Sequence, residues 1–348
     1  MTMHKATRRL SLVTLGLLIG GVGVSMIGLS ATASAEDADM AKAKAEGKVV
    51  WYTSTPIEQA NKLARLFETE TGIKVELFRS GGSAILRRFN QEQSAGQIAA
   101  DVLTTSDPAA SNVMAEQGIF IPFKPKDFDK IPAEAKDADG AWIGQRLNLI
   151  TIYMRGDKVA AADRPQKWTD LTADKYKGKL VMTDPSFTSL QLSVVGTLSQ
   201  KLGWDYYKKL ADNDVMVVQG NQQVSDYLKR GERLIAVGAL DSYAAEDRKS
   251  GHEIVTVYPS DGTFVIPSPT AVVKGSPNPN AAKAFAAFMI SPSAQKVFPA
   301  DGGYSARSDI DPPEGSPKID SLTILPVDYA ALEKNGGKIK EAFNDIFR

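Results

Sequence analysis

The sequence has no cysteine and only two histidines, His4 and His252, among its 348 residues. Without cysteine the chain cannot form disulfides, thiolate nucleophiles or sulfur-ligated zinc and iron–sulfur sites. With one histidine beyond residue 35, it cannot build the imidazole clusters that commonly hold transition metals. We therefore expect no cofactor and no resident metal, and any Ser-His-Asp arrangement would depend on His252 alone.

Motifs of common enzyme classes are also missing. The chain has no G-x-S-x-G nucleophile elbow, no Walker A sequence and no G-x-G-x-x-G dinucleotide loop. Asp and Glu are plentiful, so a secreted α/β enzyme with paired carboxylates stays open as an alternative, although no specific spacing supports one. We expect no catalytic residue.

Neither sign of charge is in excess, because 41 Lys and Arg residues balance 41 Asp and Glu residues. The first 35 residues carry Lys5, Arg8 and Arg9 and no acid, so the remainder has 38 basic and 41 acidic residues. A mildly acidic body lacks the basic surface that is typical of nucleic-acid binding. No nucleic-acid partner is therefore expected.

The N-terminus has the pattern of a cleavable secretory signal. Its basic residues precede an apolar stretch over 10–29, and Ala33-Ser34-Ala35 supplies small residues for cleavage. Five glycines interrupt the stretch, which favours cleavage over a membrane anchor of similar length. Ser11 interrupts the apolar residues expected after a twin-arginine pair, so the Sec route is favoured. Residues 1–35 are predicted to be a signal peptide and the mature protein to be periplasmic.

Beyond the leader, short β-like runs alternate with amphipathic helices. A buried strand is predicted over 49–52, then a helix that begins at Ile57 and stops at Gly72. Strands follow at 73–77 and 101–103, and Asp107-Pro108 has the pattern of an N-cap followed by proline at the first helical position. This alternation predicts a parallel sheet covered by helices.

A connector rich in Pro, Lys and Asp at 121–140 interrupts this pattern, and a second alternating set follows. Its strands are predicted at 147–154, 179–182, 215–218 and 234–237, with helices starting near Ser189, Asn221 and Ser242. We expect two α/β lobes rather than one long sheet. Lobe 1 is assigned 36–147 with 262–310, lobe 2 is assigned 148–261, and 311–348 is a C-terminal helical segment on lobe 2 or the hinge.

Six predicted strand-to-helix loops are rich in Ser, Thr, Gly and amide residues. Ligands of parallel sheets bind at this edge, and hydroxyls with free N–H groups at helix starts suit an anion. Capping and turn formation explain any single loop as well. Arg79 and Arg146 are candidate anion clamps, although a surface position is the more common role of an arginine. From these loops we expect ligand contacts by Ser54, Thr55, Gly82, Ser83, Ser106, Thr188, Ser189, Asp241 and Tyr243.

Several segments resemble bacterial type II solute-binding proteins of ABC importers in their order and spacing. They are Val-Val-Trp-Tyr-Thr-Ser at 49–54, Phe-Glu-Thr-Glu-Thr-Gly-Ile-Lys-Val at 67–75, Arg-Ser-Gly-Gly-Ser at 79–83, Gly-His-Glu-Ile at 251–254, Tyr-Pro-Ser-Asp-Gly-Thr at 258–263, Ala-Ala-Lys-Ala-Phe at 281–285 and Ser-Pro-Ser-Ala-Gln at 291–295. The branch that this chain most resembles binds ferric iron, phosphonates or sugar phosphates.

The resemblance implies a two-lobed type II periplasmic binding protein fold, in which each lobe is a mostly parallel sheet flanked by helices and crossover hinge strands join the lobes. It also implies a small solute clamped by hinge closure and delivered to an inner-membrane ABC permease with its ATPase. The functional unit is expected to be a monomer. The sequence does not separate transport from a sensor role.

Ferric members of the resembled family have adjacent tyrosines after the strand that here ends at Leu240. This chain has Asp241-Ser242-Tyr243 instead. Because Fe(III) prefers several hard anionic oxygen ligands, the predicted ligand is a small anion, namely an organophosphate, phosphonate or carboxylate. Ferric iron is the alternative.

Overall fold

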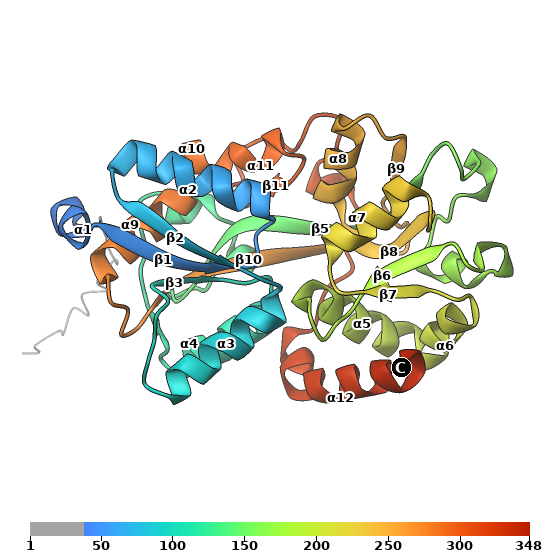
Figure 1. The fold of residues 1–348 in the computed structure, drawn as a ribbon, viewed down its shortest axis with the longest axis horizontal. Helices are drawn as coiled ribbons and strands as arrows, with labels where there is room; N and C mark the ends of the chain where they lie inside the picture. Colours follow the sequence, from blue (N-terminus) through green and yellow to red (C-terminus); the bar gives the residue numbers. More distant parts are fainter. Residues whose placement is uncertain (1–37) are drawn as a thin grey trace, which may run out of the picture. The chain divides into compact units, whose positions relative to one another are not determined.

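Strands and helices alternate along residues 38–348, the part of the chain that the computed structural model describes (Figure 1). The predicted signal peptide lies outside the described residues. The strands are β1 (Lys48–Thr53), β2 (Lys74–Arg79), β3 (Val102–Thr104), β4 (Phe120–Ile121), β5 (Ile143–Arg155), β6 (Leu180–Thr183), β7 (Met216–Val218), β8 (Ile235–Leu240), β9 (Ile254–Val257), β10 (Phe264–Val273) and β11 (Tyr304–Ser305).

The helices vary in length from single turns to the long C-terminal helix. They are α1 (Met40–Glu46), α2 (Ile57–Thr71), α3 (Gly82–Ser94), α4 (Pro108–Glu116), α5 (Ser189–Leu202), α6 (Trp204–Asp212), α7 (Asn221–Arg230), α8 (Asp241–Lys249), α9 (Pro279–Met289), α10 (Pro292–Gln295), α11 (Val297–Ala300) and α12 (Tyr329–Phe347). From residue 38 onward, none of them combines the length and the apolar content needed to cross a membrane.

Local sequence signals account for several of these boundaries. The Asp107 carboxylate accepts a hydrogen bond from the Ala110 N–H at 3.0 Å, and Pro108 follows as the first residue of α4, as predicted. Helix α2 ends at Gly72, whose φ of 77° lies in the left-handed region that favours glycine. The cap at Asp107 follows β3 at the carboxyl edge of the sheet, whereas the stop at Gly72 leads into the start of β2 at the opposite edge.

Hydrogen bonds join the strands in the order β2-β1-β3-β10-β5-β8-β6-β7. Strand β1 pairs in parallel with β2 and β3, and β6 pairs in parallel with β7 and β8. We call β1–β4 with α1–α4 and α9–α11 the first group, and β6–β9 with α5–α8 the second group. Figure 1 shows the two groups side by side with β5 and β10 running between them.

The sequence pattern predicts two sheets rather than one, and this expectation needs a correction. Strand β5 begins at Ile143, four residues before the predicted run, because residues 143–146 also adopt extended backbone. Its first half pairs antiparallel with β10 and its second half with β8, which makes the hydrogen-bonded network continuous. The predicted architecture of mostly parallel strands in two groups, joined by crossover strands, is confirmed.

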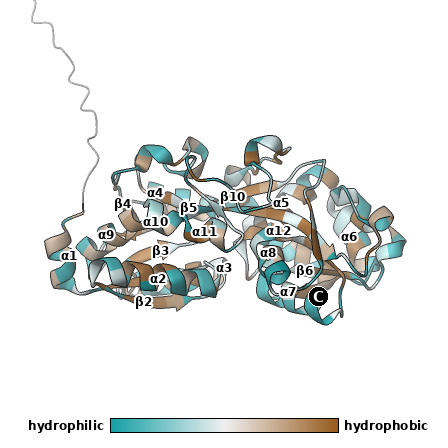
Figure 2. Cartoon of the chain, turned by 90° about the horizontal axis from the view of Figure 1, so that it is seen from above, coloured by the Kyte–Doolittle hydropathy of each residue, from teal (hydrophilic) through white to brown (hydrophobic). Residues whose placement is uncertain are grey.

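Separate hydrophobic clusters fill the two groups. In the first, the ring of Phe285 packs on Trp51 and Phe67 with centroids 5.1 and 4.9 Å apart. In the second, Tyr206 and Tyr207 are buried within the cluster that also holds Trp168 and Phe264. Figure 2 shows hydrophobic colour on the strands and hydrophilic colour on the outer faces of helices such as α2 and α7. Because each group has its own hydrophobic core, the boundary between the groups can hold polar residues.

The C-terminal helix α12 contacts α5 and α6 of the second group and α4 of the first. Its buried side chains are Leu332 and Phe343. Gly196 of α5 makes room for this packing, since a Cβ there would lie 3.2 Å from Cδ1 of Ile339 and still closer to Leu332. The segment therefore packs against both groups.

Candidate ligand-binding site

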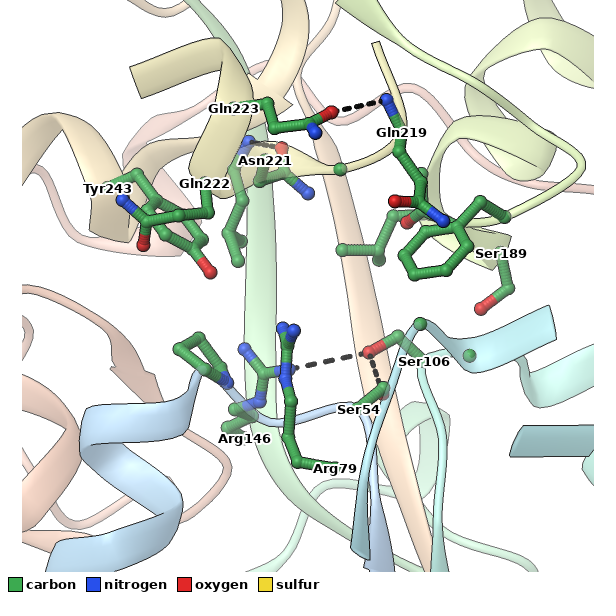
Figure 3. A pocket seen from close by; sticks show the side chains of 18 residues that line it. Ser54, Arg79, Ser106, Arg146, Ser189, Gln219, Asn221, Gln222, Gln223 and Tyr243 are labelled. Carbon is green, nitrogen blue, oxygen red and sulfur yellow. Dashed lines mark hydrogen bonds between the residues drawn. The ribbon is translucent and has the colours of Figure 1, made fainter. Parts of the chain in front are cut away.

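A cavity of about 170 Å³ lies between the two groups, at the carboxyl ends of the parallel strands (Figure 3). The loops that follow β1, β2, β3, β6 and β7 contribute to it, as does the junction of β8 with α8. Its lining residues are Ser54, Pro56, Arg79, Gly81, Gly82, Ser106, Arg146, Phe187, Thr188, Ser189, Leu190, Gln219, Gly220, Asn221, Gln222, Gln223, Leu240 and Tyr243.

The structure brings six of the nine predicted ligand-contact residues to this cavity and leaves three outside its lining. The six are Ser54, Gly82, Ser106, Thr188, Ser189 and Tyr243. The three outside are Thr55, Ser83 and Asp241.

Thr55 lies directly behind the cavity wall and holds one of its arginines. Its hydroxyl bonds with Thr53 at 2.8 Å and accepts from the Gln145 amide at 2.6 Å. Its carbonyl accepts a hydrogen bond from Nε of Arg79 at 3.1 Å. Thr55 therefore fixes the base of the Arg79 side chain.

Asp241 begins α8 but turns away from the cavity. Its carboxylate accepts hydrogen bonds from the Thr256 hydroxyl at 2.9 Å and the Tyr258 hydroxyl at 3.0 Å. Burial raises the pKa of Asp241, and these two donors oppose the rise. Both carboxylate oxygens are engaged inside the second group, so the side chain supports the wall that carries Tyr243.

Arg146 supplies a buried positive charge at the cavity. It lies in β5 with 3% of its surface exposed, and its Nη2 donates a long hydrogen bond of 3.5 Å to the Ser106 hydroxyl. Its Nε has no hydrogen-bond partner in the described structure. Burial lowers the pKa of Arg146 and Arg79 lowers it further, while Tyr243 opposes the shift; the guanidinium stays charged at neutral pH. The described lining has no carboxylate to pair with this guanidinium, and a buried charge without a counterion is costly.

Arg79 and Tyr243 flank this guanidinium from opposite groups. Figure 3 shows Arg79 and Arg146 together on one side of the cavity and Tyr243 on the other. Burial raises the pKa of the Tyr243 phenol, and the two arginines oppose this rise. The neutral phenol can donate a hydrogen bond to an anion held by the arginines.

Five helices of the described residues begin at the cavity without a side-chain cap. They are α2, α3, α5, α7 and α8, which follow the lining residues Pro56, Gly81, Thr188, Gly220 and Leu240. Uncapped N–H groups and the positive end of the helix dipole favour anions. The hydroxyl of Ser189, in the first turn of α5, is buried and has no hydrogen-bond partner in the described structure.

The prediction from sequence gave too little weight to the two arginines. It also left out the amide side chains of Gln219, Asn221, Gln222 and Gln223, which we call the amide wall. Asn221 and Gln223 belong to that wall, and their side-chain oxygens accept from the backbone N–H groups of Leu240 at 3.0 Å and Gln219 at 2.7 Å. Because the predicted strand began at residue 147, Arg146 fell outside it. An arginine inside a strand that crosses between two lobes is the signal that could have identified it.

A metal centre is not evident in residues 38–348. They contain no group of three or more His, Asp or Glu side chains placed to hold a metal ion. The cavity instead presents arginine, hydroxyl, amide and backbone N–H donors. This donor set is complementary to an oxyanion.

The chain is similar to several known transport and binding proteins. Iron uptake protein A1 of Synechocystis sp. is 27% identical over 318 residues, which make up 87% of this chain and 87% of the relative. A probable ABC transporter periplasmic-binding protein of Sinorhizobium fredii is 25% identical over 223 residues, covering 62% of each chain. The solved structure of the periplasmic binding protein AfuA from Actinobacillus pleuropneumoniae has a TM-score of 0.77 at 19% identity, covering 86% of this chain and 98% of that one.

The structural likeness confirms the predicted two-lobed periplasmic binding protein fold. Residues 62–323 match the family described as Bacterial extracellular solute-binding protein, a family of substrate-binding transport proteins. The chain belongs to this family of bacterial extracellular solute-binding proteins.

Proposed function

We propose that this protein is the periplasmic solute-binding component of an ABC importer, and that it binds a small organic anion without catalysing a reaction. The buried guanidinium of Arg146 carries this proposal, because within residues 38–348 it lines the cavity with its Nε unbonded and with no carboxylate in the lining. A bound phosphate, phosphonate or carboxylate would supply the missing charge. The family match supports export to the periplasm and delivery to a membrane permease with its ATPase.

The proposed binding set combines the predicted residues with those that the cavity adds. Arg79, Arg146 and Tyr243 hold the anionic group, and the uncapped starts of α3 and α5 add N–H donors. Thr55, Ser83 and Asp241 act from behind the wall. Direct contacts come from Ser54, Gly82, Ser106, Thr188 and Ser189.

Residues 36–147 with 262–310 form lobe 1 in this proposal, and 148–261 form lobe 2. The separate cores support this division, except that Phe264 and Ile266 pack in the core of lobe 2. The protein acts as a monomer that closes over the solute, with β5 and β10 as the hinge. Because Arg146 lies in β5, an anion bound to its guanidinium would be in direct contact with a hinge strand.

Ferric iron is a second candidate, because the name of the Synechocystis relative states iron uptake. The AfuA structure, in contrast, is described with fructose-6-phosphate bound. The cavity of this chain favours the anion: its lining has one tyrosine and no carboxylate among the described residues, whereas Fe(III) prefers several anionic oxygens.

A thermal-shift screen tests the proposal. Residues 36–348, unfolded and refolded to remove bound solute, are heated with organophosphates, phosphonates, carboxylates, polyamines or ferric citrate. A ligand at about one hundred times its Kd stabilises by roughly 2.7 kcal/mol. We expect stabilisation by an organic anion and none by polyamines. Stabilisation by ferric citrate alone would favour the iron candidate, and stabilisation by polyamines alone would contradict the proposal.

A further inference from the structure

The charged side chains that line the cavity are all positive. Its ionisable lining residues are Arg79, Arg146 and Tyr243, and no described lining residue carries a carboxylate. Two guanidiniums therefore face a ligand with no protein acid between them. Any positive group on the ligand would therefore enter a cavity that carries positive charge and has no carboxylate in its described lining.

Two acids of α8, Asp241 and Glu246, do not balance this positive charge. Asp241 is 1% exposed, and both of its oxygens accept hydrogen bonds from Thr256 and Tyr258. Glu246, which also acts on Tyr243, lies one helical turn further along α8, is exposed, and does not line the cavity. An ammonium group needs acceptors for its three donors, and these carboxylates are not available to it.

The amide wall also presents donors. The side-chain oxygen of Asn221 is occupied by the Leu240 N–H and that of Gln223 by the Gln219 N–H, which leaves their NH2 groups to face the ligand. Gln222 is oriented the other way, with its nitrogen on Asp226. Gln222 and Gln223 are both exposed at the rim, so Asn221 is the partly buried donor of this wall. Figure 3 shows these amides on the side of the cavity opposite the arginines.

From this arrangement we infer that the site selects anions whose remaining part is polar and uncharged, and that it rejects zwitterions. The inference rests on the proposed function and names its selectivity. A hydroxyl, ether or carbonyl oxygen on the ligand body can accept from the amide NH2 groups. An ammonium group in the same position would lose its hydration, find no carboxylate in the described lining and be repelled by Arg79 and Arg146.

Matched probes that differ in one group test this selectivity by calorimetric titration. One pair is 2-hydroxyethyl phosphate and 2-aminoethyl phosphate; the other is 4-hydroxybutyrate and 4-aminobutyrate. In each pair that binds, we expect the hydroxyl member to bind at least tenfold more tightly. Equal or tighter binding of the ammonium member would overturn the selectivity and leave the anion site intact. If no probe of either pair binds, the anion site itself fails, and the proposed function falls with the inference.

The variant Asn221→Asp supplies the missing acid with little change in shape. Its remaining oxygen can still accept from the Leu240 N–H, while the second oxygen replaces the NH2 group that faces the cavity. We expect the preference for the hydroxyl member to fall at least fivefold. Gln200→Glu, an exposed site on α5 outside this cavity, makes the same charge change and should leave the preference unaltered. An unchanged preference in Asn221→Asp, or loss of both probes, would contradict the placement of the ligand body at this wall.

Discussion

Gly81 lies against the ring of Phe187 across the rim of the cavity. A Cβ at position 81 would lie 2.6 Å from Cδ1 of Phe187 and 2.7 Å from its carbonyl oxygen. The same carbonyl accepts the N–H of Ser83 at 3.3 Å, and Arg87 donates to the Ser186 carbonyl at 3.1 Å. The start of α3 in the first group thus docks onto the loop before α5 in the second, and this contact requires a residue without a side chain.

The variant Gly81→Ala should weaken ligand binding without unfolding the protein. The backbone at Gly81, with φ of −68° and ψ of 150°, suits alanine, so the first group can fold unchanged. The added methyl group obstructs contact with Phe187 when the two groups close. We expect Kd to rise about tenfold, or roughly 1.4 kcal/mol, and calorimetry measures it.

Gly337→Ala is the matched control, because a Cβ at that position of α12 meets no atom within 4 Å. It should leave Kd unchanged and stabilise the helix by up to about 1 kcal/mol. An unaltered Kd in Gly81→Ala would show that closure at this rim does not contribute to affinity.

Replacing Arg146 by methionine should separate stability from binding. Removing a buried charge without a counterion is expected to raise the free energy of unfolding of the ligand-free protein by about 1 kcal/mol or more. The same change removes the main partner of the anion, so Kd should rise by on the order of thirtyfold, or 2 kcal/mol. Urea unfolding and calorimetry measure the two effects.

Arg155→Met is the control at the other end of β5. Arg155 bonds with the carboxylate of Asp157 at 2.8 and 2.7 Å, and with backbone carbonyls, away from the cavity. This variant should lose stability and keep its affinity. If both arginine variants keep their affinity, Arg146 does not bind the ligand.

The variant Asp241→Asn should change the pH dependence of stability more than ligand affinity. Because burial raises the pKa of Asp241 above its ordinary value of 3.8, the folded protein holds this proton more tightly than the unfolded chain. The stabilising contribution is complete below pH 3.8 and is lost as the pH rises through the raised pKa. Asparagine removes this dependence, so the variant should gain stability relative to the parent as the pH rises toward neutrality.

Urea unfolding at acidic and neutral pH measures the difference, and Kd should change less than about threefold because Asp241 bonds to Thr256 and Tyr258 rather than lining the cavity. A loss of affinity as large as that of Arg146→Met would instead return Asp241 to the ligand contacts predicted from sequence.

Helix α12 should contribute strongly to stability through one aromatic side chain. Phe343 is 1% exposed and packs on Tyr207 and Phe347, with ring centroids 6.3 and 4.5 Å apart. Phe343→Ala is expected to lower the free energy of unfolding by about 3 kcal/mol, measured by urea denaturation. Phe347→Ala, at the end of the helix and less buried, should cost less than half as much. Equal costs would mean that α12 is not anchored at Phe343.

Local sequence signals predict several helix boundaries of the fold correctly. The cap at Asp107 and the stop at Gly72 follow from side-chain chemistry within a few residues. The continuity of the sheet does not, because pairing of β5 with β10 joins residues more than a hundred positions apart. Local patterns also locate the strand-to-helix loops, and so Ser54, Ser106 and Tyr243. They cannot tell which way Asp241 turns, since Thr256 and Tyr258 decide that from a neighbouring strand.

A crystal structure of residues 36–348 with the best anion from the screen tests the central claim most directly. We expect the anionic group within hydrogen-bond distance of the Arg146 guanidinium, with Arg79 and Tyr243 as further partners and the ligand body toward Asn221. An anion bound away from Arg146, or a metal ion held by Tyr243 and Asp241 in its place, would contradict the account.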